Sequence, residues 1–225
     1  MAEITPYTRP ALGTGIYTIP DISIILGLPP HKVRRWICDF WDDRLAMNSG
    51  HTYSLGIGKE RVVSFHLLIE FFTFFQLRQF GVSARRILDA HSFLSEFLKT
   101  PYPFASSNIL TEGHKVLFSP QVNTIINADS GLQLYLTEII EPFCKKVEFN
   151  SSNLAKRFWP NGRQSSVVVD PDHQFGQPTI SGTNILTESL ISMYKAGENI
   201  QFIAELYEIT ETQVHDALAF RKIAA

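Results

Sequence analysis

The sequence has little cysteine, almost no net charge and no long apolar run, and each shortage excludes a class of protein. Its two cysteines, Cys38 and Cys144, belong to no CxxC pair, so we expect buried free thiols in a reducing compartment. The first residues lack the basic-then-apolar pattern of a signal peptide. The most apolar run, residues 65–80, is too short and too polar for a membrane span. We therefore expect a cytoplasmic protein without membrane contact.

Recognisable enzyme motifs are also lacking. There is no Gly-x-Ser-x-Gly and no His-Glu-x-x-His, and the glycines of GTGIYT follow no strand, which disfavours a dinucleotide loop. Asp170, Asp172 and His173 are grouped as metal ligands often are, but Pro171 and the surrounding turn residues explain the aspartates as turn formers. We expect no enzyme activity, no cofactor and no metal.

Charge is distributed unevenly although the net charge is only −2. Residues 1–100 hold 11 Lys/Arg against 9 Asp/Glu, whereas residues 185–225 hold 3 against 6. Overall charge does not mark a nucleic-acid binder, so any DNA-facing surface is expected in the first half.

What is present is a pair of predicted short helices around a sharp turn, within residues 17–41. Thr18 can cap the first helix, with Asp21 at capping-box spacing. Gly27 suits the end of that helix, because it adopts a left-handed backbone without strain. Pro29 and Pro30 suit the first turn of the second helix.

The second helix combines an apolar face with a basic one. Helical spacing places Val33, Trp36, Ile37 and Phe40 inside, and leaves His31, Lys32, Arg34 and Arg35 outside. The pattern favours a helix-turn-helix with a basic recognition helix that ends at Asp42 and Asp43. The alternative is an ordinary helical hairpin with a solvated basic face.

A turn-rich stretch, residues 48–58, and a β-prone run from Arg61 predict a hairpin, or wing, beside the recognition helix. Lys59 and Arg61 are its candidate phosphate contacts, and the alternative is a solvated charge pair with Glu60. Helices are expected over 65–79 and 83–100. The second of them would form a homodimer or else pack on its own chain, with His91 as a core residue.

The remaining chain is predicted to be mixed. Residues 109–118 and 123–128 alternate as strands do, 131–146 fits a helix, and short strands are expected near 157–159 and 167–169. Helices are expected over 187–196, 199–208 and 210–223, with Thr187, Asn199 and Thr210 as N-caps. The predicted class is α+β and mainly α. It comprises a winged helix-turn-helix at 1–103, a mixed segment at 104–165 and a tri-helical unit at 166–225.

The last unit repeats the opening helix pair at a constant offset of 181 residues. Apolar or small residues recur at five positions: Ile22, Ser23, Leu28, Val33 and Ile37 match Ile203, Ala204, Ile209, Val214 and Leu218. The outward residues differ, since Glu211, His215 and Asp216 replace the basic cluster. Attraction to phosphate grows with the number of cations, so this unit is expected to contact protein rather than DNA.

Two resemblances follow from these motifs. The first half resembles MerR-like winged-helix domains in Leu26-Gly27-Leu28, Val33-Arg34-Arg35-Trp36 and the wing at 58–64. That resemblance implies DNA contacts by Arg34 and Arg61, with Arg35 standing where the family has Tyr. The last third resembles the domain of unknown function 433 in Val169-Asp170-Pro171, residues 175–180 and Ser181-Gly182-Thr183, with Asn184 where that family usually has Arg.

Proteins that join these two parts resemble antitoxins of the VapB type. The resemblance implies double-stranded DNA as a partner, repression of the protein's own operon and neutralisation of a PIN-like ribonuclease toxin. Two alternatives remain open: a ligand-responsive MerR-like regulator without a toxin, and an interaction protein that does not bind DNA.

Overall fold

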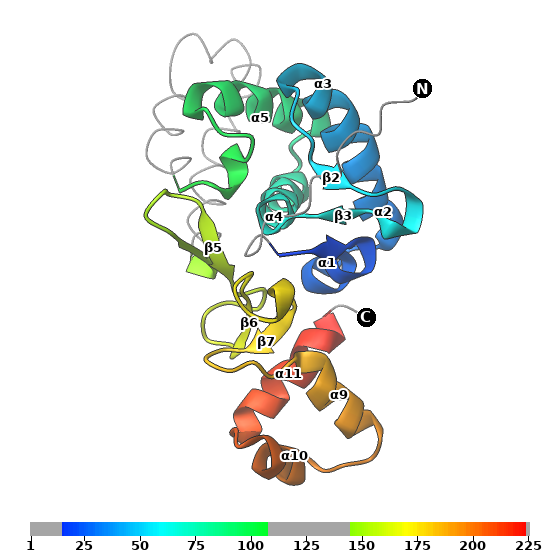
Figure 1. Ribbon diagram of the computed structural model, residues 1–225, viewed down its shortest axis with the longest axis vertical. Helices are drawn as coiled ribbons and strands as arrows, with labels where there is room; N and C mark the ends of the chain where they lie inside the picture. The colour runs from blue at the N-terminus through cyan, green and yellow to red at the C-terminus, as the bar shows by residue number, and fades with distance from the viewer. Residues whose placement is uncertain (1–14, 108–144, 224–225) are drawn as a thin grey trace, which may run out of the picture.

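The computed structural model describes residues 15–107 and 145–223. Helices predominate over two small antiparallel sheets, as the predicted class requires. Figure 1 shows an N-terminal body built around α4 (Phe65–Gln79) and a separate group of three helices at the opposite end of the molecule, with strands β6 and β7 between them. The predicted strands at 109–118 and 123–128, nearly all of the predicted helix at 131–146, and Cys144 lie outside the described residues. Cys38 is a free, half-buried thiol.

The N-terminal body begins with a three-stranded antiparallel sheet in the order β1-β3-β2. It contains β1 (Tyr17–Thr18), β2 (Ser54–Leu55) and β3 (Val62–Val63), so the predicted hairpin between β2 and β3 is confirmed. The helix α1 (Ile19–Leu26) follows β1 directly. Its predicted capping box is present, because Asp21 N donates to Thr18 Oγ1 at 3.3 Å and Thr18 N donates to Asp21 Oδ2 at 2.8 Å.

The second helix is longer than predicted. After α2 (Pro30–Arg35) the chain continues as a π-helical segment, Trp36–Leu45, and as α3 (Ala46–Ser49). The expectation that Asp42 and Asp43 end this helix is wrong. Trp41 and Leu45 are fully buried, so the apolar face extends past the aspartates, and the helix ends instead at Gly50 with φ +67°.

Aromatic packing around α4 forms the core. The indole of Trp36 contacts Phe74 with ring centroids 4.8 Å apart, and that of Trp41 contacts Phe71 at 4.7 Å, both edge to face. The next helix, α5 (Ala84–Leu98), begins at the predicted cap residue Ser83 and buries Ile87, Leu88, His91 and Leu94 against the same core. The predicted helix pair is therefore confirmed.

A second sheet joins the middle of the chain to its end. Its order is β4-β5-β6-β7, from β4 (Val147–Phe149), β5 (Ala155–Phe158), β6 (Val167–Val169) and β7 (Pro178–Ile180), all antiparallel. The predicted boundary between residues 165 and 166 thus falls inside one hydrogen-bonded sheet. The boundary between 103 and 104 falls inside the 3₁₀ turn Pro103–Ala105.

The three terminal helices are α9 (Thr187–Lys195), α10 (Ile200–Tyr207) and α11 (Glu211–Ile223). Asn199 caps α10, and Thr210 and Gln213 form a reciprocal box before α11, as predicted. Thr187 is not the N-cap of α9. Leu186 occupies that position, and Thr187 is buried in the first turn, because its side chain faces the interior rather than the helix end.

The offset of 181 residues is a repeat of backbone structure. N-caps fall at Thr18 and Asn199, and left-handed C-caps at Gly27 and Glu208. The turns use the same bond, since the N–H of residue 28 donates to the carbonyl of residue 23 at 3.0 Å, and that of residue 209 to residue 204 at 3.0 Å. The five matched positions therefore serve equivalent packing roles, although Ile209 and Leu218 are only half-buried.

Tyr17 joins the N-terminal body to the segment between β6 and β7. Its ring is fully buried, and the N–H of Ile16 donates to the carbonyl of Phe175 at 3.1 Å. Gly176 has φ +86°, and a Cβ at this position would collide with the Tyr17 hydroxyl. Burial raises the pKa of Tyr17 well above its usual value, and the carboxylates of Asp170 and Asp21 add to this effect.

Candidate nucleic-acid interface

The predicted recognition helix presents its cations to solvent. His31, Lys32, Arg34 and Arg35 are all exposed, whereas Val33 between them is fully buried. This division follows from the helical period, since the turn at Gly27 fixes which face of α2 packs on α1. The result is a short helix that is inserted in the core on one side and positively charged on the other.

Most of these cations form no strong ion pair within the described residues. Arg35 lies 3.6 Å from Asp39 with both side chains more than half exposed, and its guanidinium lies 5.8 Å from the Phe40 ring centroid. An exposed pair of this kind contributes little, so Arg35 can exchange it for another anion. Within residues 15–107 and 145–223, His31, Lys32 and Arg34 make no ion pair. Their charge is available to a ligand.

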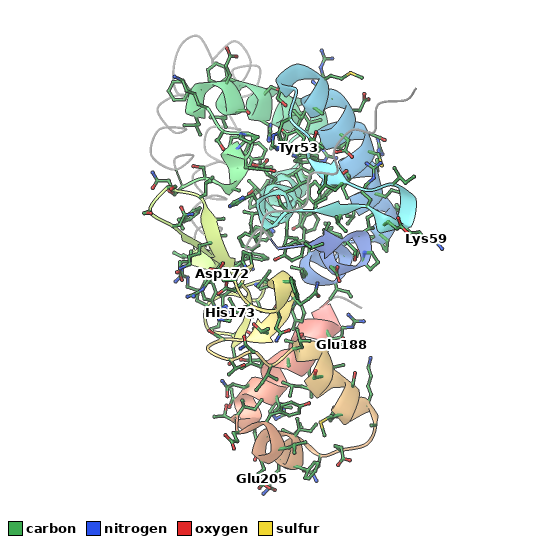
Figure 2. The ribbon with its side chains drawn as sticks, viewed as in Figure 1. Tyr53, Lys59, Asp172, His173, Glu188 and Glu205 are labelled. Atoms are coloured by element: carbon green, nitrogen blue, oxygen red, sulfur yellow. The ribbon has the colours of Figure 1, made fainter. Side chains whose placement is uncertain are left out.

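The hairpin between β2 and β3 adds a further exposed cation. Lys59 lies in the 3₁₀ turn Gly58–Glu60 near the hairpin tip, and Figure 2 shows it at the outer edge of the N-terminal body, pointing away from the fold. Ile57 beside it is 81% exposed. The tip therefore presents one cation and one apolar side chain together.

Arg61 is placed differently from the other predicted contacts. Its guanidinium forms an ion pair with Asp42, which lies on the long helix formed by α2, the π-helical segment and α3. It also donates to Ser54 Oγ at 3.3 Å, and its side chain is only 20% exposed. The hydroxyl of Ser54 donates to the same carboxylate at 2.6 Å. Arg61 thus joins the hairpin to the helix, and it does so from within the fold.

Sequence reasoning missed this role for Asp42. The residue was interpreted as a helix stop, and its partner lies 19 positions away across a turn whose register the sequence does not specify. A second cross-link of this kind, between Arg44 and Asp89 at 2.5 Å, connects the long helix to α5. The two pairs connect the π-helical segment Trp36–Leu45 to the hairpin and to α5.

The helix expected to form a dimer uses its apolar face within the chain. Ile87, Leu88, His91 and Leu94 all pack on the core of the same molecule. Toward its C-terminal end Phe93 and Phe97 stack with ring centroids 6.4 Å apart, and Phe97 is half exposed. Phe97 is therefore the large apolar side chain of α5 that is most accessible among the described residues.

The second helix pair has the same backbone but different chemistry. By the offset of 181 residues, the positions equivalent to Lys32, Arg34 and Arg35 hold Gln213, His215 and Asp216. His215 is exposed, and Asp216 accepts a hydrogen bond from Ser166 N at 2.7 Å. The second pair therefore has no lysine or arginine at the positions that form the cationic face of the first.

The group at Asp170 is an internal ion-pair cluster. Arg157 Nε donates to Asp170 Oδ2 at 2.6 Å, and His173 Nδ1 lies 3.1 Å from the same oxygen. The hydrogen bond to Asp170 raises the pKa of Arg157. Asp172, labelled with His173 in Figure 2, donates its backbone N–H to Asp170 Oδ1 at 3.0 Å. Within the described residues, no group of three or more His, Cys, Asp or Glu side chains is arranged to hold a metal ion. No described helix is long and apolar enough to cross a membrane.

Comparison with known proteins identifies a matching family, a similar sequence and a similar structure. Residues 167–220 match a family described as a protein of unknown function, DUF433. Over 224 residues the chain is 26% identical to the Mycobacterium tuberculosis protein described as "Putative antitoxin VapB45", with 90% of this chain and 92% of that protein covered. A crystal structure of Rv2018 from Mycobacterium tuberculosis shares the fold, with a TM-score of 0.71 at 23% identity over 90% of this chain and 96% of the other. The C-terminal unit, from β6 through α11, is thus the part of the chain that corresponds to a defined family.

Proposed function

We propose that this chain is a DNA-binding transcriptional regulator, and that it acts as the antitoxin of a type II toxin–antitoxin pair. The observation that carries the DNA-binding part is the exposed cationic face of α2, held by a buried apolar face and flanked by Lys59. Lys32, Arg34, Arg35 and Lys59 supply four full charges per chain to a phosphate backbone, and His31 adds a donor. We define these five residues as the basic face.

The fold suits insertion of this helix into a major groove. A helix-turn-helix reads DNA with its second helix, and here α2 is the second helix of a tightly capped pair. The hairpin tip then lies along the backbone, where Lys59 reaches a phosphate. Arg61 serves this geometry by holding the hairpin against Asp42, which is a positioning role and not the direct DNA contact that a MerR-like model assigns to it.

The antitoxin part rests on the relative. That protein is described as an antitoxin, and the similarity extends over nine-tenths of both chains. The C-terminal unit has no lysine or arginine at the positions equivalent to the cations of α2, so we assign it to protein contacts. In this proposal the protein partner is a PIN-like ribonuclease toxin encoded beside the gene, and the chain represses its own operon as a homodimer.

Two measurements test the two parts separately. Fluorescence anisotropy with a labelled duplex from upstream of the chain's own gene tests DNA binding, and we expect tighter binding than to a scrambled duplex of equal length. Co-expression with the protein encoded by the adjacent gene tests the antitoxin role. We expect a stable complex on size exclusion and rescue of growth when the neighbour is toxic. Equal affinity for both duplexes at low salt contradicts the first part, and a neighbour that neither binds nor harms the cell contradicts the second.

A further inference from the structure

A cavity of about 620 Å³ lies away from the basic face, between the end of the long helix, the chain leading into β2, and α5. Figure 2 shows Tyr53 between α5 and β2, and Tyr53 is one of the residues that line the cavity. Its volume is within the range of small-molecule sites, roughly 300–1,000 Å³. The cavity is lined by Leu45, Ser49, His51, Tyr53, His91, Ser92, Ser95, Glu96, Lys99, Thr100 and Pro101.

One wall of the cavity is aromatic and uncharged. The rings of His51 and Tyr53 meet edge to face at 4.8 Å, and both pack edge to face on Tyr102. Burial lowers the pKa of His51 and raises the pKa of Tyr53 to about 12, so both are neutral near pH 7. Neutral aromatic faces attract cations through the ring quadrupole.

Most hydroxyl groups around the cavity already donate their protons to backbone carbonyl groups of the chain. Ser49 donates to the carbonyl of Leu45 at 2.9 Å, Ser92 to that of Leu88 at 3.1 Å, and Ser95 to that of Thr100 at 2.7 Å. Tyr53 donates to the carbonyl of Pro101 at 3.3 Å. Each hydroxyl oxygen is left with lone pairs and no further proton to donate. A ligand therefore meets acceptors and few donors.

His91 brings a buried polar pair to the cavity wall. Its side chain is 1% exposed, and its Nε2 lies 2.8 Å from Glu70 Oε2. Its Nδ1 is buried and has no hydrogen-bond partner among the described residues. A buried polar atom without a partner is rare, so this part of the wall differs from an ordinary apolar core.

We propose that this cavity binds a small organic cation with several N–H donors, such as a guanidine or a primary amine. The donors bind the hydroxyl oxygens, and the positive charge lies against the aromatic wall and near Glu96 at the rim. Lys99 on the same rim opposes such a ligand and favours an anion. The two exposed rim charges therefore distinguish the ligand classes.

Isothermal titration calorimetry of the full chain with agmatine tests this assignment, with sodium acetate as the anionic probe. We expect saturable binding of one agmatine per chain and none of acetate. Glu96→Gln should weaken agmatine binding roughly two- to fivefold, and Lys99→Gln should strengthen it by a similar factor, which is the range for an exposed charge pair. Both residues are exposed, so the fold should be retained. Glu205→Gln, on α10 at the far end of the molecule in Figure 2, is the matched control and should change nothing.

Several results would overturn the proposal. They are the absence of agmatine binding, acetate binding in its place, or effects of Glu96→Gln and Lys99→Gln in the opposite directions. A second measurement examines the interior of the site. In a ¹⁵N spectrum of histidine-labelled protein, agmatine should shift the ring signals of His51 and His91, which both line the cavity, and unchanged signals of both at saturation would place the ligand elsewhere. Neither measurement involves DNA or the toxin, so this proposal and the proposed function fail separately.

Discussion

The sharpest test of the basic face is the salt dependence of DNA binding in a Lys32→Ala/Arg34→Ala variant. Both side chains are exposed and free of ion pairs in the described structure, so their removal should leave the fold intact. Each phosphate contact contributes about 0.9 to the slope of log K against log salt for duplex DNA. If the four full charges of the basic face all contact phosphates, the slope is about −3.6 per chain.

The double variant removes two of these contacts. Its slope should therefore fall in magnitude by about 1.8 per chain, or by about 3.6 for a dimer that binds two half-sites. The assay is fluorescence anisotropy with the upstream duplex between about 50 and 300 mM KCl, a range over which the Debye length shortens from roughly 14 to 6 Å. Lys195→Ala on α9 is the matched control, because it removes an exposed lysine from the unit assigned to protein contacts. A slope that does not change in the double variant would refute the assignment of α2 to DNA.

Arg61→Ala makes a different prediction from the one that the sequence suggests. As a direct contact, Arg61 would contribute to the salt slope like the others. As a partner of Asp42 it acts on the hairpin, so its loss should destabilise the fold by about 1–3 kcal/mol, since a largely buried carboxylate loses its charged partner. Thermal unfolding and anisotropy on the same variant separate the two roles. A normal melting temperature with a reduced salt slope would restore the direct contact.

Three further predictions concern stability, each measured by urea denaturation. Gly176→Ala should lower the free energy of unfolding by about 2 kcal/mol, because it places a Cβ at a positive φ and against the Tyr17 hydroxyl. An unchanged denaturation midpoint would show that Tyr17 moves aside at little cost. Glu70→Ala should cost about 3 kcal/mol, since its carboxylate accepts the N–H groups of Phe104 and Ala105, whereas Glu70→Gln retains the acceptor and should cost less. Burial lowers the pKa of His66, so as pH falls below about 6.5 the unfolded chain binds a proton at this residue before the folded chain does. The free energy of unfolding should therefore decrease from about pH 7 to pH 5.5, and it should decrease less in His66→Gln.

The sequence predicted local structure well where the chemistry is local. The capping box at Thr18, the caps at Ser83 and Asn199, and the left-handed turn at Gly27 depend on residues within four positions of one another, and all are present. Helix length was predicted less well. Asp42 and Asp43 look like a stop because aspartate is common at helix ends, but the buried Trp41 and Leu45 favour continuation, and tertiary burial outweighs propensity.

The site was predicted in part for the same reason. Exposure of the α2 cations follows from helical period, which a sequence displays directly. The pairing of Arg61 with Asp42, and the meeting of Tyr17 with Gly176, join positions that are distant along the chain. No periodicity encodes such contacts. The sequence indicates β5 and β6 but neither β4 nor β7 nor the pairing of the four strands, because strands of only three or four residues carry little pattern.

The repeat at offset 181 separates fold from function within one chain. Both helix pairs share an N-cap position, a left-handed C-cap and the same closing hydrogen bond, so backbone geometry does not distinguish them. Surface charge does, since Lys32, Arg34 and Arg35 of the first pair correspond to Gln213, His215 and Asp216 of the second, which include no lysine or arginine. If shape alone determined DNA binding, both ends would bind. If charge determines it, added lysines on α11 should make the second pair bind DNA. Asp216 accepts a hydrogen bond from Ser166 N, so its replacement would also remove a structural contact. Glu211→Lys changes the charge without that loss.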